Sequence, residues 1–120
     1  MVFLANATSD NVIKLYLKVI NSLLNLTHRE LDILETFVLL DINWTDNRYK
    51  NIIDAFCRKH VMKQTYIIKA NLSKCIKIFK EKNILVEHET GMWSINPSLL
   101  PSNLFKDDSI NIEFTIKIEK

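Results

Sequence analysis

The side chains with the clearest chemistry in this chain are the lysines and arginines of residues 48–82. This segment holds ten basic and two acidic residues, a net charge of +8, although the whole chain of 120 residues carries only +2. The other 85 residues hold six basic and twelve acidic side chains, a net charge of −6. Such segregation is costly through self-repulsion, and it creates a face that attracts phosphate. The charge pattern therefore predicts DNA binding; the alternative is a solvated lysine-rich helix that binds nothing.

Part of this charge falls on one face of a predicted helix. The helix begins between Thr65 and Ala70 and ends near Asn83, a residue that can end a helix in the left-handed conformation. Its predicted buried stripe is Ile68, Leu72, Cys75, Ile76 and Phe79, and its polar residues recur at spacings of three and four on the opposite side. From such a face, lysine and serine reach phosphates or base edges, and lysine can donate to guanine O6 and N7. The candidate DNA contacts on this face are Lys69, Ser73, Lys74 and Lys77.

Four more candidates lie at the start of that helix, where helix N-termini meet base edges in helix-turn-helix proteins. They are Gln64, Thr65, Tyr66 and Asn71. Asparagine or glutamine could pair with adenine. The alternative is that Asn71 and Thr65 only cap the helix.

Further cations flank the helix. Arg58, Lys59 and Lys63 precede it and are predicted to hold backbone phosphates. Lys80 and Lys82 follow it and would oppose the helix macrodipole.

Three other helices are predicted before this one from apolar residues at a period near 3.6. The first starts at a Ser9–Asp10 cap and is broken at Asn25–Leu26; the second runs from a capping box, with Thr27 as the cap and Glu30 three residues on, to about Leu40. The third runs from a cap at Thr45 or Asp46 to about Lys59, and residues 60–64 turn the chain. The inward face of the third helix is predicted to hold Tyr49, Ile52, Ile53, Phe56 and Cys57.

A β-hairpin and a C-terminal strand are predicted after the basic helix. Residues 84–86 and 92–95 form the two hairpin strands, and the polar tip between them carries Glu87, His88 and Glu89. His88 is a candidate phosphate contact, although a plain loop histidine is the alternative. Trp93 is expected beneath the hairpin. Residues 109–119 alternate between apolar and polar side chains, which is typical of a half-buried strand.

The order helix-helix-helix-hairpin over residues 27–97 resembles the winged helix-turn-helix superfamily. The run Leu26-Thr27-His28-Arg29-Glu30-Leu31 is similar to the start of the first helix of MarR-type regulators, and residues 71–85 are similar to a recognition helix leading into a wing. Gly91-Met92-Trp93-Ser94-Ile95-Asn96-Pro97-Ser98-Leu99-Leu100 resembles the wing end of RepL-type plasmid and phage replication proteins. The acidic tip departs from the lysine-rich wings of the superfamily, so DNA insertion by the wing is in question.

Other chemistries find little support in the sequence. Cys57 and Cys75 fall at apolar helical positions, and the three histidines are scattered, so neither a cofactor nor a metal site is expected. The acidic pair Asp107–Asp108 has no nearby histidine or glycine-rich loop, so we expect no enzyme. No apolar run is long enough to span a membrane, and the two free cysteines favour the cytoplasm.

These observations predict a single α+β domain over residues 1–120. It is a winged helix-turn-helix with an extra N-terminal helix at 9–26, a core at 27–97 and a C-terminal extension at 98–120 that includes a β-strand. The expected function is that of a plasmid or phage DNA-binding protein, a replication initiator or a transcriptional regulator, with double-stranded DNA as its partner. A protein-protein docking module without DNA binding is the alternative. The apolar N-terminal helix and C-terminal strand also predict a homodimer.

Overall fold

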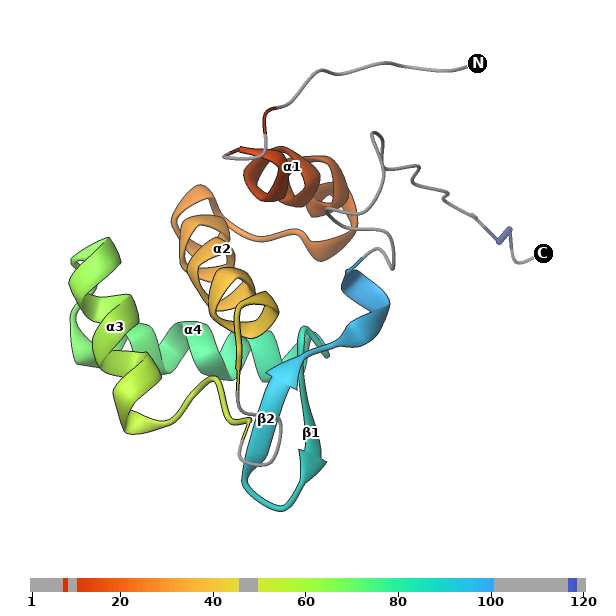
Figure 1. Ribbon diagram of the computed structural model, residues 1–120. Helices are drawn as coiled ribbons and strands as arrows, with labels where there is room; N and C mark the ends of the chain where they lie inside the picture. The colour runs from red at the N-terminus through yellow and green to blue at the C-terminus, as the bar shows by residue number, and fades with distance from the viewer. Residues whose placement is uncertain (1–7, 9–10, 46–49, 101–116, 119–120) are drawn as a thin grey trace.

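The computed structural model describes residues 8, 11–45, 50–100 and 117–118. Within them the chain forms four helices, α1 (Val12–Leu24), α2 (His28–Ile42), α3 (Ala55–Thr65) and α4 (Lys69–Glu81). The strands β1 (Leu85–Glu89) and β2 (Met92–Ile95) and the short 3₁₀ turn η2 (Pro97–Leu99) follow. Helix α1 lies at one end of the molecule and the hairpin at the other, with α2 between them (Figure 1). This is the predicted α+β fold, and it is consistent with a winged helix.

The core forms where α1, α3, α4 and the hairpin meet around α2. Helix α2 starts at the predicted capping box: the Thr27 hydroxyl accepts from the Glu30 backbone N–H at 3.1 Å, and the Glu30 carboxylate accepts from the Thr27 N–H at 2.8 Å. Its apolar stripe is buried, and the Phe37 ring meets Phe79 of α4 edge-on with 6.3 Å between centroids. Helix α1 buries four of its predicted apolar residues against this core, Ile13, Leu17, Ile20 and Leu24.

The predicted bounds of the third helix are wrong. Helix α3 begins only at Ala55, because the Asp54 carboxylate accepts from the Cys57 N–H at 2.7 Å and caps it. It continues to Thr65 through the stretch predicted as a turn. Phe56, predicted to face inward, is 79% exposed. Ile52 and Ile53 are buried as predicted, but they precede the helix.

The hairpin forms an antiparallel pair with Leu85 opposite Ile95 and Glu87 opposite Trp93. Strand β2 has the predicted bounds, whereas β1 begins one residue later and extends further than predicted, since Glu87 to Glu89 belong to it. The register is irregular between Glu87 and Glu89. Gly91 turns the chain with a φ of 77°, which glycine adopts without steric cost. The hairpin therefore projects as a two-stranded wing beside α4.

Three parts of the prediction lie wholly or mostly outside the described residues. Residues 46–49, with the Asp46 cap and the inward-facing Tyr49 of the predicted third helix, are the first. The Ser9–Asp10 cap is the second; the structure has Asn11 as the N-cap of α1. The C-terminal strand over 109–119 is the third, and within it only Lys117 and Ile118 are described. Ile118, predicted on the buried face, is 82% exposed.

Candidate nucleic-acid interface

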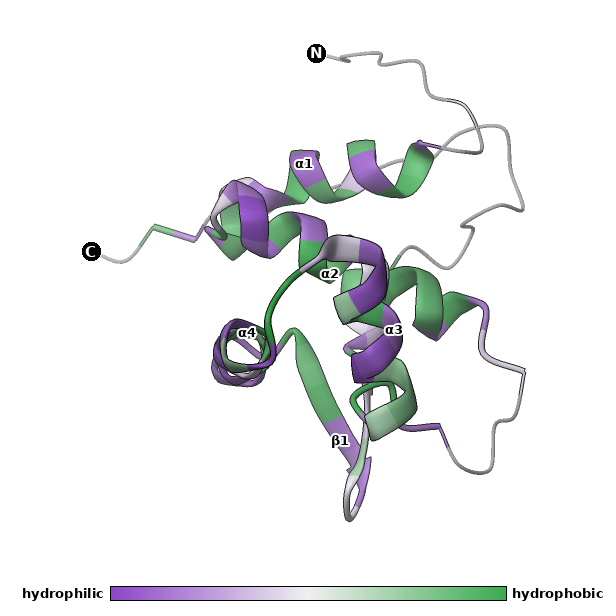
Figure 2. Cartoon of the chain, turned by 90° about the vertical axis from the view of Figure 1, so that its left-hand side faces the viewer, coloured by the Kyte–Doolittle hydropathy of each residue, from purple (hydrophilic) through white to green (hydrophobic). Residues whose placement is uncertain are grey.

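Helix α4 is held by one apolar stripe and leaves the opposite face open. Its buried residues are Leu72, Cys75, Ile76 and Phe79, as predicted. Asn83 ends the helical region with a left-handed φ of 59°, also as predicted. In Figure 2, which looks almost along α4, the hairpin and α3 lie to one side of the helix, so its other side faces solvent.

Four cations of the basic segment are used by the protein itself. The Lys50 ammonium pairs with the Asp41 carboxylate at 2.6 Å, and the Arg58 Nε donates to the Ile53 carbonyl at 2.7 Å. Lys80 lies over the Trp93 ring, with its Nζ 4.2 Å from the ring centroid. Lys82 donates to the carbonyls of Leu24 and Asn25 at 2.8 and 3.1 Å, and so satisfies the C-terminal end of α1.

Five cations remain exposed, and within the described part of the chain none of them forms a hydrogen bond or ion pair. They are Lys59 and Lys63 on α3 and Lys69, Lys74 and Lys77 on α4. Exposed charges without ion-pair partners raise the local positive potential. Helices α3 and α4 therefore both present cations to solvent, although fewer than the charge count of the segment indicates.

The turn between α3 and α4 exposes apolar side chains that the sequence prediction missed. Tyr66 has a left-handed φ of 58° and is 89% exposed. Ile68, predicted as part of the buried stripe of α4, is 64% exposed, and Ile67 is buried in its place. The three-residue turn thus moves the apolar pattern by one position, which no local periodicity reveals.

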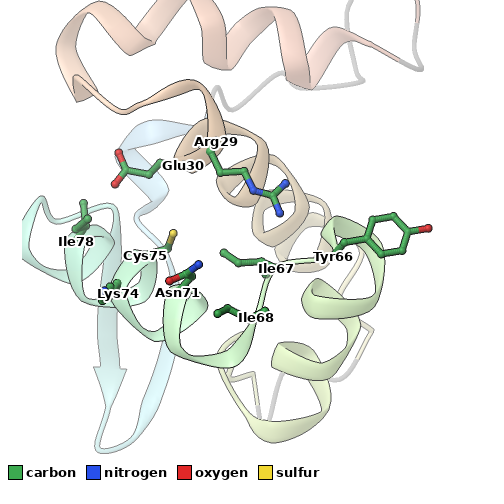
Figure 3. Close-up of a pocket in the computed structure, with 9 residues that line it drawn as sticks. All are labelled: Arg29, Glu30, Tyr66, Ile67, Ile68, Asn71, Lys74, Cys75 and Ile78. Carbon is green, nitrogen blue, oxygen red and sulfur yellow. The ribbon is translucent and has the colours of Figure 1, made fainter.

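An open hollow of about 400 Å³ lies between this turn, the start of α2 and α4. Its lining includes Arg29, Ile68, Asn71 and Lys74, which Figure 3 shows with their neighbours. Arg29 was not among the predicted candidates; its Nη2 donates to the Thr65 carbonyl at 2.6 Å and joins the start of α2 to the end of α3.

The other predicted polar candidates divide between free and engaged side chains. Gln64, Asn71 and Ser73 are exposed, and among the described residues their side chains form no hydrogen bond. The Thr65 hydroxyl donates to the Val61 carbonyl at 2.7 Å, within α3. Helix α4 has Ile68 as its N-cap and no side-chain cap, so the alternative that Asn71 and Thr65 serve as its caps is wrong.

Two exposed polar side chains of the hairpin form hydrogen bonds within the protein. The Glu87 carboxylate accepts from the Gly91 N–H at 2.9 Å, and the exposed His88 has its Nε2 3.1 Å from the Lys50 carbonyl. That oxygen can only accept, so the imidazole donates. Trp93 is half-buried against the core, as expected.

One carboxylate positions the hairpin. Asp41, 8% exposed at the end of α2, accepts from the Lys50 ammonium through Oδ1 and from the Ile95 backbone N–H through Oδ2 at 2.8 Å. Asp41 therefore joins α2, the segment before α3 and strand β2. No sequence rule identified it, because an acid in the last turn of a helix opposes the macrodipole.

The two cysteines are buried and free. Burial, together with the hydrogen bond to Asp54 and the charge of that residue, raises the pKa of Cys57 to about 12. Burial also raises the pKa of Cys75. No three His, Cys, Asp or Glu side chains gather as a metal site in the described ranges. No helix there is long and apolar enough to cross a bilayer.

The comparisons with known proteins give one match. Residues 2–115 match a family model described as Firmicute plasmid replication protein (RepL). No curated protein and no solved structure matches the chain. The family match extends well beyond residues 91–100, on which the resemblance in the sequence was based.

Proposed function

We propose that this chain, which belongs to the RepL family of Firmicute plasmid replication proteins, binds double-stranded DNA as a replication initiator. Helix α4 would enter the major groove as the recognition helix of a winged helix-turn-helix, and hairpin β1–β2 would lie beside it. The observation that carries the proposal is the open face of α4, where Lys69, Lys74 and Lys77 are exposed and without counter-charges among the described residues.

The remaining candidates take roles that fit their positions. Lys59, Lys63 and the outer part of Arg58 would hold the DNA backbone from α3, because phosphate contacts set the register of a protein on the duplex. Gln64, Thr65, Tyr66, Asn71 and Ser73 would approach the bases, and His88 the backbone beside the hairpin. The proposal is one of binding in the host cytoplasm and assigns no catalytic residue.

A salt titration tests the proposal. If the five exposed lysines meet phosphates, log K for duplex DNA falls with log salt at a slope of about −4 to −5. The measurement uses fluorescence anisotropy with a random duplex and with duplexes from the replicon that encodes the chain. Specific binding requires tighter association with one of the replicon duplexes. Binding to neither duplex, or binding that is indifferent to salt, would contradict it.

A protein-docking function is the second candidate, and one observation favours it. Leu39, Trp44, Phe56 and His60 contribute to an open hollow of about 450 Å³, in which the Phe56 ring is almost fully solvent-accessible. Exposed aromatic side chains are enriched at protein interfaces. Phe56→Ser should leave DNA affinity unchanged. If the same variant no longer binds a protein partner that the wild-type chain binds, the two functions lie on separate surfaces.

We also propose that the protein is a homodimer through α1. Val19 and Leu23 of that helix are 43% and 67% exposed, although Ile13, Leu17, Ile20 and Leu24 of the same helix are buried in the core. A two-fold dimer doubles the phosphate contacts on a palindromic site. Sedimentation at micromolar concentration should give twice the mass of the chain, and Leu23→Asp should restore the monomer.

A further inference from the structure

Two of the three residues before α4, Tyr66 and Ile68, depart from local conformational preferences. Tyr66 holds a left-handed conformation, which costs a residue with a Cβ roughly 1–2 kcal/mol. Ile68 occupies the N-cap of α4 without any side-chain bond, whereas Thr27 and Asp54 cap α2 and α3 in the usual way. Departures from local preference are expected where a sequence serves a function, so this turn is a candidate for recognition.

Ile68 is also exposed, and it lies beside an amide that has no partner. Figure 3 shows Ile68 and Asn71 next to each other on the α4 side of the hollow, while the Tyr66 ring points outward. The Asn71 amide forms no hydrogen bond within the described residues. An exposed aliphatic group next to a free carboxamide is chemically matched to one kind of base pair. The thymine methyl group makes apolar contacts. Adenine forms a bidentate pair with asparagine, in which the adenine N6–H donates to Oδ1 and the asparagine Nδ2–H donates to adenine N7.

The surroundings of this pair favour nucleic acid as the occupant. Lys74 lines the same hollow, and Lys69 follows Ile68 directly, so cations flank the apolar group. Ala70, which is exposed between Lys69 and Asn71, has a short side chain that would not prevent close approach of the helix to the base edges in a groove. A protein partner of apolar chemistry would have to desolvate these lysines, whereas a DNA backbone neutralises them.

We infer that Ile68 and Asn71 form a reader of A·T base pairs, with Ile68 against the C5-methyl group of thymine and Asn71 on the adenine edge. The inference deepens the proposed function and rests on it. It adds the kind of sequence that the protein prefers, because the lysines alone would hold any duplex equally well.

The experiment starts with duplexes selected by the full-length protein from a random library. The selected sequences should share a core in which A·T pairs are required. Each thymine of that core is then replaced by deoxyuridine, which lacks only the methyl group and keeps pairing and phosphates unchanged. Burial of one methyl group corresponds to about a fourfold change in affinity, so one substitution should weaken binding by about that factor. The salt dependence should remain the same.

Variants assign the effect to the two residues. Ile68→Ala should bind the thymine duplex about fourfold more weakly and should no longer distinguish thymine from deoxyuridine. Phe56→Ala is the control, because Phe56 is also a largely exposed apolar residue, at 79%, but lines the other hollow; it should keep the wild-type distinction. Asn71→Ala should lose at least fivefold and become insensitive to 7-deazaadenine, which removes adenine N7.

The possible outcomes test the A·T reader separately from the proposed binding of duplex DNA. Equal affinity of the wild-type protein for thymine and deoxyuridine duplexes, with a steep salt slope, would overturn the A·T reader and leave DNA binding standing. A selected core made of G·C pairs would do the same. Failure to bind any duplex would remove both. Thermal unfolding of each variant checks that an affinity loss is not a folding defect, and the base substitutions test the wild-type protein directly.

Discussion

Helix α4 and the hairpin β1–β2 are joined by the turn at Asn83 and lie side by side. Their polar side chains differ in how many already have partners in the protein. Helix α4 leaves three lysines exposed and without partners in the described structure. The hairpin carries Glu87 and Glu89, and it turns His88 toward the Lys50 carbonyl. The exposed lysines of α4 are available to an anionic ligand, whereas Glu87 and His88 of the hairpin already form hydrogen bonds within the protein.

The cations of the basic segment divide in the same way, into those that stabilise the fold and those that remain exposed. Lys50 and Lys80 belong to the same basic segment as Lys74, but one pairs with Asp41 and the other stacks on Trp93. Both of these contacts lie against the hairpin or its anchor. The basic segment therefore supports the hairpin with some of its cations and leaves others exposed, where the proposed DNA ligand could reach them. A count of charges does not reveal this division.

The largest expected effect comes from removing the anchor of the hairpin. Asp41→Ala leaves the Lys50 ammonium and the Ile95 N–H without their buried acceptor, which should lower the free energy of unfolding by about 3 kcal/mol. Urea denaturation measures it. Asp32→Ala, a change of the same type on α2, should cost well under half as much. If the folded Asp41 variant keeps full DNA affinity, the hairpin is a structural support only.

Removal of the free lysines of α4 tests the other side of the comparison. The triple variant Lys69→Ala, Lys74→Ala and Lys77→Ala should bind duplex DNA roughly a hundredfold more weakly near 0.15 M salt, with a slope reduced by about three. Lys14→Ala with Lys18→Ala removes two exposed lysines of α1 and should change neither quantity. An unchanged slope in the triple variant would mean that α4 does not face the backbone.

Lys80 distinguishes the two uses of lysine on one helix. Lys80→Ala should lower the free energy of unfolding by about 0.5–1 kcal/mol through loss of the contact with Trp93. It should leave the salt slope of DNA binding unaltered, because the Lys80 ammonium is already committed to the protein. Lys77→Ala, three residues earlier, should show the reverse: unchanged stability and a slope smaller by about one. Matching slopes for the two variants would remove the distinction.

The smallest expected effect is on the hairpin itself. Glu89→Gln removes a negative charge that lies near the backbone if the hairpin flanks bound DNA, so affinity at low salt should rise about twofold, the order of one weak exposed charge interaction. Anisotropy titrations at two salt concentrations measure this change. A rise that persists at high salt would indicate a direct contact instead of a long-range charge effect.

Much of the fold follows from local rules. The capping box at Thr27 and Glu30, the apolar stripe of α4 and the left-handed Asn83 were all predicted from residue types and spacing, and the structure confirms them. Each depends on contacts within a few residues, which is why a pattern can reveal it.

The errors have non-local causes. The apolar spacing from Ile52 to Cys57 resembles a helix, but the Ile52 N–H donates to the Trp93 carbonyl at 3.0 Å, and residues 52–54 form a turn before α3 begins. Sequence patterns did not identify Asp41 and Arg29, because their hydrogen-bond partners lie far along the chain, at Ile95 and Thr65. The exposed Ile68 was assigned to the core because the turn at Tyr66 shifts the pattern by one residue.

Lys82 has a consequence for the geometry of the target site. Its ammonium holds the last carbonyls of α1 from the residue that ends α4, so the two helices cannot slide relative to each other without breaking that link. In a dimer joined through α1, the same link would fix the distance between the two copies of α4. Because the distance between the two recognition helices determines the spacing of the half-sites, Lys82 would help to set the number of base pairs between them. A longer or shorter spacer would weaken binding even though every base contact was kept.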